Sequence, residues 1–115
     1  MHELSVAANM VEIATEEAAR RGGAHVLALH LKLGQLSGVA RDALMFSWEA
    51  VCEDTPLKGA RLMIEEQPVV VYCPACRAAR TLTSVQEFAC PVCGVPTPKV
   101  LRGRELEVVA LELET

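Results

Sequence analysis

Four cysteines in the C-terminal half of the chain constrain its fold more than any other feature. They form two Cys-Pro-X-Cys pairs separated by thirteen residues, at Cys73, Cys76, Cys90 and Cys93. Each pair places two thiolates on one tight turn, and two facing turns complete a tetrahedron around one metal ion. A reducing compartment disfavours disulfides, so this spacing predicts a tetrathiolate metal site.

The four thiolates fill every position of a tetrahedral ion, so the predicted metal is structural and no position stays open for substrate or water. Zinc is the first expectation, and iron in a rubredoxin-like site is the alternative. The segment is too small to pack without its ion, so metal binding and folding are expected to be one event. Its small core is predicted to contain four apolar side chains: Tyr72, Leu82, Val85 and Phe88. The fifth cysteine, Cys52, is predicted to be a small buried hydrophobe on a helix.

Composition and charge exclude several classes of protein. No apolar run among the 115 residues approaches the length needed to span a bilayer, and the first apolar stretch lacks a basic leader, which predicts a cytoplasmic protein. The chain carries a formal charge of −4. Basic residues outnumber acidic ones between Cys73 and Arg104, so an acidic body carries a basic module. This distribution favours protein partners over a nucleic-acid duplex.

Hydrophobic periodicity predicts two helices and three main strands. Apolar residues recur at helical spacing from Leu4 to Arg21, where Gly22-Gly23 ends the helix. Leucines alternate in "HVLALHLKLG", which predicts a half-buried strand with His30 facing away from the leucines. A second helix follows in "RDALMFSWEAVCED". The second strand runs from about 60 to 66, is interrupted at Pro68 and resumes in "VVVY", and the third strand is "RELEVVALELE".

These elements predict an α+β fold in which two helices pack on a small three-stranded sheet. The cysteine segment differs in composition, with prolines, glycines and few large aliphatics, and it lies between two strands. It is therefore expected to be an inserted four-cysteine zinc domain. The predicted boundaries are residues 1–68 and 104–115 for the body and residues 69–103 for the insertion.

The first three residues could form a second metal site. The Met1 amine, the His2 amide and the His2 imidazole can close adjacent chelate rings, and the Glu3 amide can complete a plane of four nitrogens. Square-planar nitrogen coordination suits Ni(II) and Cu(II), and amides in the first turn of a helix have no acceptor within that helix. A histidine near a terminus is more often simply solvated, so the sequence chemistry alone leaves an ordinary terminus as the alternative interpretation.

The combination of "MHELSVAANM", "LKLGQLSGV" and two late C-x2-C pairs resembles the HypA/HybF family of hydrogenase nickel-incorporation proteins over essentially the whole chain. The resemblance implies a nickel metallochaperone with a nickel site at its N-terminus. It implies nickel coordination by His2, with backbone nitrogens of Met1 and Glu3 as co-ligands, and structural Zn(II) on Cys73, Cys76, Cys90 and Cys93. Some members have an acidic residue in the loop after the first strand, but this chain has Ala40 there and Asp42 two residues later.

As the resemblance implies, we expect Ni(II) to be transient cargo. The expected partners are a GTPase accessory protein and the large-subunit precursor of a nickel–iron hydrogenase, with no nucleic acid and no membrane. The chain would be a monomer or weak homodimer, and nothing in the sequence shows whether urease is also served. No phosphate loop, nucleophile elbow or acid–base pair is present, so we expect no enzyme activity. The rival hypotheses are a zinc-ribbon adaptor or nucleic-acid-binding protein with an incidental His2, and a rubredoxin-like redox module.

Overall fold

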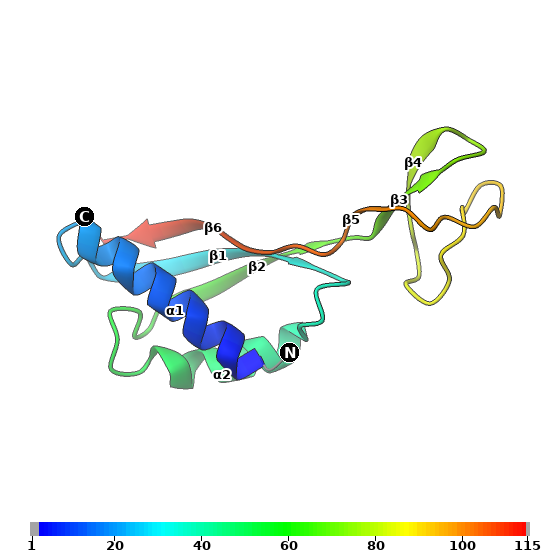
Figure 1. Ribbon diagram of the computed structural model, residues 1–115. Helices are drawn as coiled ribbons and strands as arrows, with labels where there is room; N and C mark the ends of the chain where they lie inside the picture. Colours follow the sequence, from blue (N-terminus) through cyan, green and yellow to red (C-terminus); the bar gives the residue numbers. More distant parts are fainter. Residues whose placement is uncertain (1–2, 115) are drawn as a thin grey trace. The chain divides into compact units, whose positions relative to one another are not determined.

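A computed structural model describes residues 3–114 and contains two helices and six strands (Figure 1). The two helices and the main strands lie where the hydrophobic periodicity placed them. No helix within the described residues is long and apolar enough to cross a membrane. The elements in chain order are α1 (Glu3–Arg20), β1 (Val26–Gly34), α2 (Arg41–Cys52), β2 (Arg61–Gln67), β3 (Val70–Cys73), β4 (Ala78–Thr81), β5 (Val100–Arg102) and β6 (Leu106–Leu113).

The chain divides into two compact units. The helix–sheet unit contains residues 1–32, 39–65 and 107–115, and the cysteine unit contains residues 33–38 and 66–106. The loop at residues 33–38, which sequence analysis assigned to the body, therefore groups with the cysteines. We propose that the two units fold separately, as the composition of the insertion suggests.

The helix–sheet unit is built on a sheet with the strand order β2-β1-β6. Hydrogen bonds at both ends of β1, from Val26 N to Pro56 O and from Gln35 N to Gln67 O, show that β1 and β2 run in the same direction. The Glu114 N to His25 O bond joins the end of β6 to the start of β1, so β6 runs in the opposite direction. Both helices cover one face of this sheet (Figure 1).

Aliphatic side chains fill the space between the helices and the sheet. Leu29 and Leu31 of β1 are buried as predicted, while His30 on the opposite face is partly exposed. The predicted alternation fails at the start of the strand, where Leu27 is exposed and Ala28 is buried. The buried Trp48 of α2 packs in the same core and donates its indole N–H to the Ala60 carbonyl at 2.9 Å. Leu44 and Cys52 occupy the same helix stripe and are buried, which confirms the prediction for Cys52.

Gly22 and Gly23 end α1 as predicted. Gly22 has a positive φ of 81°. The Gly23 amide donates to the Ala18 carbonyl at 2.8 Å, and the Gly22 amide donates to the Ala19 carbonyl at 3.2 Å. These two bonds form a Schellman motif, which satisfies carbonyls that the helix itself leaves without donors.

The cysteine unit has a second sheet with the strand order β4-β3-β5. Both neighbours are antiparallel to β3, with Tyr72 opposite Ala79 and Val70 opposite Arg102. At the base of this unit the backbones of Gly34 and Gly103 lie in close contact. A Cβ at position 34 would lie 2.1 Å from the Gly103 carbonyl oxygen, so only glycine fits there.

The core of the cysteine unit is small and differs in part from the prediction. Leu82 is buried with Val69 and Val71, and three partly buried side chains pack against them: Leu36, Phe88 and Val100. The inclusion of Leu82 and Phe88 is confirmed.

The prediction that Tyr72 and Val85 belong to this core was wrong. Tyr72 alternates with the buried Val71 and Cys73, so its ring lies on the other face of β3, 6.0 Å from Lys99 Nζ. Val85 is exposed on the loop after β4. Helical or strand periodicity is absent from such a loop, so spacing alone could not place Val85.

Candidate metal centre

The cysteine sulfurs lie on two turns, and in each turn a backbone amide donates a hydrogen bond to one sulfur. In the first turn the Cys76 amide donates to Cys73 Sγ at 3.3 Å, and in the second the Val92 amide donates to Cys90 Sγ at 3.4 Å. The residue after each pair has a positive φ, 53° at Arg77 and 77° at Gly94. This left-handed backbone conformation closes each turn, and glycine supplies it without strain at the second.

The two turns bring all four sulfurs together. Each offers one donor atom, and all four lie within 4.8 Å of one another. The Sγ atoms of Cys73 and Cys93 are 3.5 Å apart, and those of Cys76 and Cys90 are 4.0 Å apart. Four sulfurs bound at about 2.3 Å to a tetrahedral ion are about 3.8 Å apart, so the cluster has the dimensions of a metal site. All five cysteines are free of disulfides.

Local surroundings shift the pKa values of two thiols of this cluster in opposite directions. Desolvation raises the pKa of the Cys90 thiol, but the amides of Cys93 and Val92 outweigh it and lower the pKa to about 6. A backbone hydrogen bond from Val95 lowers the pKa of the Cys93 thiol, but hydrogen bonds to the neighbouring cysteines and desolvation outweigh it and raise the pKa to about 12. One sulfur of the cluster therefore ionises easily, and ionising a neighbour costs more.

Arg80 on β4 is a member of this site that sequence reasoning missed. Hydrogen bonds to the Cys76 and Cys90 sulfurs raise the pKa of its guanidinium. A permanent positive charge beside a tetrathiolate offsets part of the charge of −2 that four thiolates and a divalent ion would carry. The sequence signal was the excess of basic residues in the insertion, which did not indicate which of them contacts sulfur.

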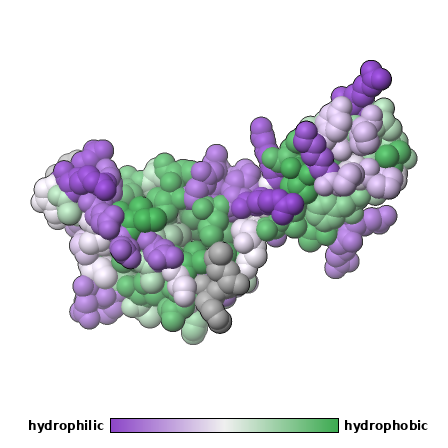
Figure 2. Space-filling view, viewed as in Figure 1, coloured by the Kyte–Doolittle hydropathy of each residue, from purple (hydrophilic) through white to green (hydrophobic). Residues whose placement is uncertain are grey.

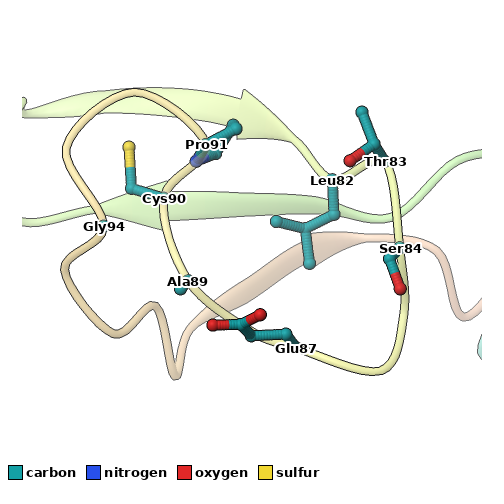
Figure 3. Close-up of a pocket in the computed structure, with 8 residues that line it drawn as sticks. All are labelled: Leu82, Thr83, Ser84, Glu87, Ala89, Cys90, Pro91 and Gly94. Atoms are coloured by element: carbon teal, nitrogen blue, oxygen red, sulfur yellow. The ribbon is translucent and has the colours of Figure 1, made fainter.

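A shallow hollow lies beside Cys90 in the same unit. Figure 3 shows Cys90 at one side, Thr83 and Ser84 at the other, and Leu82 between them, with Glu87 at the rim. Hydroxyls and one carboxylate without a histidine or lysine do not form a nucleophile with its base. The hollow therefore supports no catalytic assignment.

The predicted nickel ligands are placed only in part. Met1 and His2 lie outside the described residues. Glu3 begins α1, and its carboxylate Oε2 accepts a hydrogen bond from the Ala40 amide at 2.9 Å. Within residues 3–114, no other group of three or more His, Cys, Asp or Glu donors gathers apart from the four cysteines.

The remaining candidates have ordinary structural surroundings. His25 lies in the loop before β1, where its carbonyl accepts from Glu114. His30 Nε2 lies 2.7 Å from Glu112 Oε2 on the partly exposed face of the sheet. The Asp42 side chain is fully exposed, 3.5 Å from Arg41 Nη1.

The helix–sheet unit also has an open groove between α1 and β6. Exposed Ile13 and Val109 contribute apolar surface there, and Glu16, Glu17, Arg20 and Arg21 form a charged border. Figure 2 shows hydrophobic surface on this unit bordered by hydrophilic side chains. The groove contains no histidine or cysteine, so it offers no soft metal ligand.

Comparison with known proteins identifies the family. The family described as "Hydrogenase/urease nickel incorporation, metallochaperone, hypA" matches residues 1–113. This chain belongs to that family. Hydrogenase maturation factor HypA of Chloroflexus aurantiacus is 54% identical over 112 residues, which cover 97% of this chain and 98% of that protein. The protein of the same name from Roseiflexus sp. strain RS-1 is 50% identical, covering 99% and 93%.

Two solved structures share the fold of this HypA-family chain. The solution structure of the Ni metallochaperone HypA from Helicobacter pylori aligns with a TM-score of 0.63 at 22% identity, covering 98% of this chain and 97% of that one. The solution structure of a second HypA protein aligns with a TM-score of 0.67 at 23% identity. The predicted combination of two helices, a three-stranded sheet and a four-cysteine cluster is thereby confirmed.

Proposed function

We propose that this chain binds Ni(II) at its N-terminus and delivers it for maturation of a nickel–iron hydrogenase. The match of the nickel-incorporation family to residues 1–113 is the observation that carries the proposal. The proposed ligands are the His2 imidazole and amide, the Met1 amine and the Glu3 amide. Glu3 lies in the first turn of α1, where helix geometry leaves amides without an acceptor in their own helix.

The proposed resident ion at the cysteine cluster is Zn(II), held by Cys73, Cys76, Cys90 and Cys93. The sulfur spacing suits a tetrahedral ion, and zinc prefers thiolates in that geometry. Bound zinc would cross-link the two cysteine turns. Iron on the same sulfurs is the alternative, and a red protein as purified would favour it.

Delivery is proposed to occur by ligand exchange rather than by covalent catalysis, so the chain is not proposed to be an enzyme. A square-planar ion has open axial faces that an acceptor's ligand can approach. Protonation of the His2 imidazole or of the amides weakens the site and assists release. The proposed recipients, a GTPase accessory protein and the hydrogenase large-subunit precursor, follow from family resemblance. The proposed location is the cytoplasm.

The test measures nickel and zinc per chain in three proteins. These are the wild type, His2→Ala and a variant with one residue added before Met1. We expect both variants to lose nickel and keep zinc, because each removes a donor or displaces the terminal amine. His25→Ala is the matched control, since His25 lies in the loop before β1, and it should bind nickel like the wild type.

Unchanged nickel binding in both N-terminal variants would contradict the proposal. The rival class, a zinc-ribbon adaptor or nucleic-acid-binding protein, is tested by titrating RNA or DNA at two salt concentrations. Affinity that falls steeply with salt would favour the rival.

A further inference from the structure

Arg80 lies on the face of the small sheet that carries the cysteines. Its Cα pairs with that of Val71 across β4 and β3, and side chains directly opposite each other in an antiparallel pair share a face. Cys73, two residues after Val71, lies on the same face because side chains alternate along a strand. Val71 and Cys73 are fully buried, and Arg80 is partly buried. The register of the two strands therefore directs the Arg80 side chain toward the sulfurs.

The Arg80 guanidinium contacts one sulfur from each cysteine turn. It donates hydrogen bonds to Cys76 of the first turn and to Cys90 of the second. The Sγ atoms of these two cysteines are 4.0 Å apart, so they form one edge of the four-sulfur cluster. A guanidinium suits this edge because it is a planar fork with several N–H donors, whereas a lysine ammonium is a point charge. Arg80 therefore joins two turns whose cysteines lie 14 residues apart in the chain.

The inner nitrogen of the same side chain shows that this placement has an energetic cost. The Nε atom of Arg80 is buried and has no hydrogen-bond partner among the described residues. Enclosing an N–H group without an acceptor is unfavourable. The bonds to sulfur offset this cost best around a bound ion, where every sulfur is a thiolate, because charge-assisted hydrogen bonds are stronger than neutral ones. Arg80 therefore stabilises the metal-bound centre more than the empty one.

We propose that Arg80 is a positioning residue of the metal centre, one that joins the two cysteine turns and lowers the net negative charge of the bound centre. This inference rests on the proposed Zn(II) ion. Groups that hydrogen-bond to metal ligands orient those ligands and tune the metal. Arg80 is not itself a ligand, so its loss weakens the site without opening a coordination position.

Arg80→Met tests this role with little change in packing. Methionine keeps an apolar stem beside Val71 but has neither the charge nor the N–H donors of arginine. We expect zinc affinity to fall about 10–100-fold, the effect typical of removing a partner of a metal ligand. Arg80→Lys keeps the charge but not the fork, so its zinc affinity should lie between those of the wild type and Arg80→Met.

Arg102→Met is the matched control. Arg102 on β5 pairs with Val70, which precedes Val71 in the strand, so Arg102 lies on the opposite face of the same sheet from Arg80. Its side chain is exposed. The variant removes one positive charge from the cysteine unit, and it should keep the zinc affinity of the wild type.

The experiment measures zinc affinity by competition with a chromophoric chelator and, in a second sample, the absorption of Co(II) bound in place of zinc. Co(II) bound to thiolates gives sulfur-to-metal charge-transfer bands. The energy of these bands falls when sulfur loses a hydrogen bond or a nearby positive charge. The bands should therefore move to longer wavelength in Arg80→Met and stay unmoved in Arg102→Met, a change that a purely structural role would not produce.

Wild-type zinc affinity in Arg80→Met would overturn the positioning role and leave the proposed ion intact. Weaker affinity with unmoved Co(II) bands would also overturn it, because the loss would then come from packing. Full affinity in Arg80→Lys would overturn the joining of the two turns, since charge alone would suffice. Equal losses in Arg80→Met and Arg102→Met would mean that the overall charge of the unit controls the metal. A wild-type protein that binds neither zinc nor Co(II) would overturn both proposals.

Discussion

The two units of the molecule achieve order in different ways. The helix–sheet unit buries a broad aliphatic core in which Leu29, Leu31 and Leu44 are fully enclosed. The cysteine unit has a buried cluster of three side chains, Val69, Val71 and Leu82. Burial of apolar area scales with the size of the core, so the second cluster contributes much less to stability.

The difference shows where each unit obtains its stability. Small domains that cannot bury enough apolar surface are commonly stabilised by disulfides or metals. The cysteine unit has no disulfide but has four converging sulfurs, so a metal bound there would replace the missing core. The helix–sheet unit needs no such replacement.

Metal removal should have the largest effect, and it should act on the cysteine unit alone. A zinc chelator should disorder residues 73–98, because structural zinc in small domains contributes about 10–16 kcal/mol of binding free energy. Hydrogen exchange measured by mass spectrometry should show lost protection there and retained protection in α1, β1 and α2. Global unfolding on chelation would contradict the separation of the two units.

Removal of one ligand should reproduce that result without a chelator. Cys90→Ala should abolish stoichiometric zinc binding, because it leaves three thiolates and an open position at a structural site. Cys52→Ala is the matched control, since Cys52 is buried in the other unit. Zinc content measured by elemental analysis should stay at one per chain in that control. Zinc loss in both variants would mean that general destabilisation, and not ligation, controls the metal.

A pair of leucine truncations sharpens the comparison. Leu44→Ala leaves a cavity in the larger core and should lower the free energy of unfolding of the helix–sheet unit by about 2–5 kcal/mol. Leu36→Ala, on the partly buried side chain that packs against Val69 and Val71, should instead weaken zinc affinity. Urea denaturation and a zinc competition assay measure the two effects. If Leu36→Ala left zinc affinity unchanged, the small core would not contribute to the metal site.

The smallest expected effect concerns pH. Burial raises the pKa of the Cys52 thiol to about 11, above its ordinary value near 9. The unfolded chain ionises this thiol first, so its contribution to stability is complete below about pH 8.5 and is lost as the pH rises toward 11. The loss should reach about 2–3 kcal/mol at most, following the pKa difference. Denaturation of the wild type and of Cys52→Ala at several pH values isolates the contribution of this thiol. The same pH dependence of the free energy of unfolding in both proteins would contradict the prediction.

Sequence reasoning succeeded where spacing carries the information. The alternating leucines around His30, the helix end at Gly22-Gly23 and the spacing of the four cysteines each predicted a feature that the structure contains. These are local patterns, and local backbone geometry produces them.

Sequence reasoning failed where contacts join distant residues. The bond from Ala40 to Glu3 spans 37 positions, and the packing of Leu36 on Val69 depends on how a loop folds back. Val85 was assigned to the core because it is apolar, but the loop that holds it has no periodicity to orient it. The assignment of His2 as a nickel ligand lies outside the described residues and stays a prediction.

The pairing of β1 with β6 has a consequence for synthesis on the ribosome. The whole cysteine unit after residue 65 is translated before β6, so β1 must wait for its partner strand until the insertion has emerged. Contacts between residues far apart in the chain form late because their loops are costly to close. The cysteine turns can therefore acquire metal while the sheet of the other unit is still incomplete. The four sulfurs would thus be in place on a nascent chain before the three-stranded sheet of the other unit is complete.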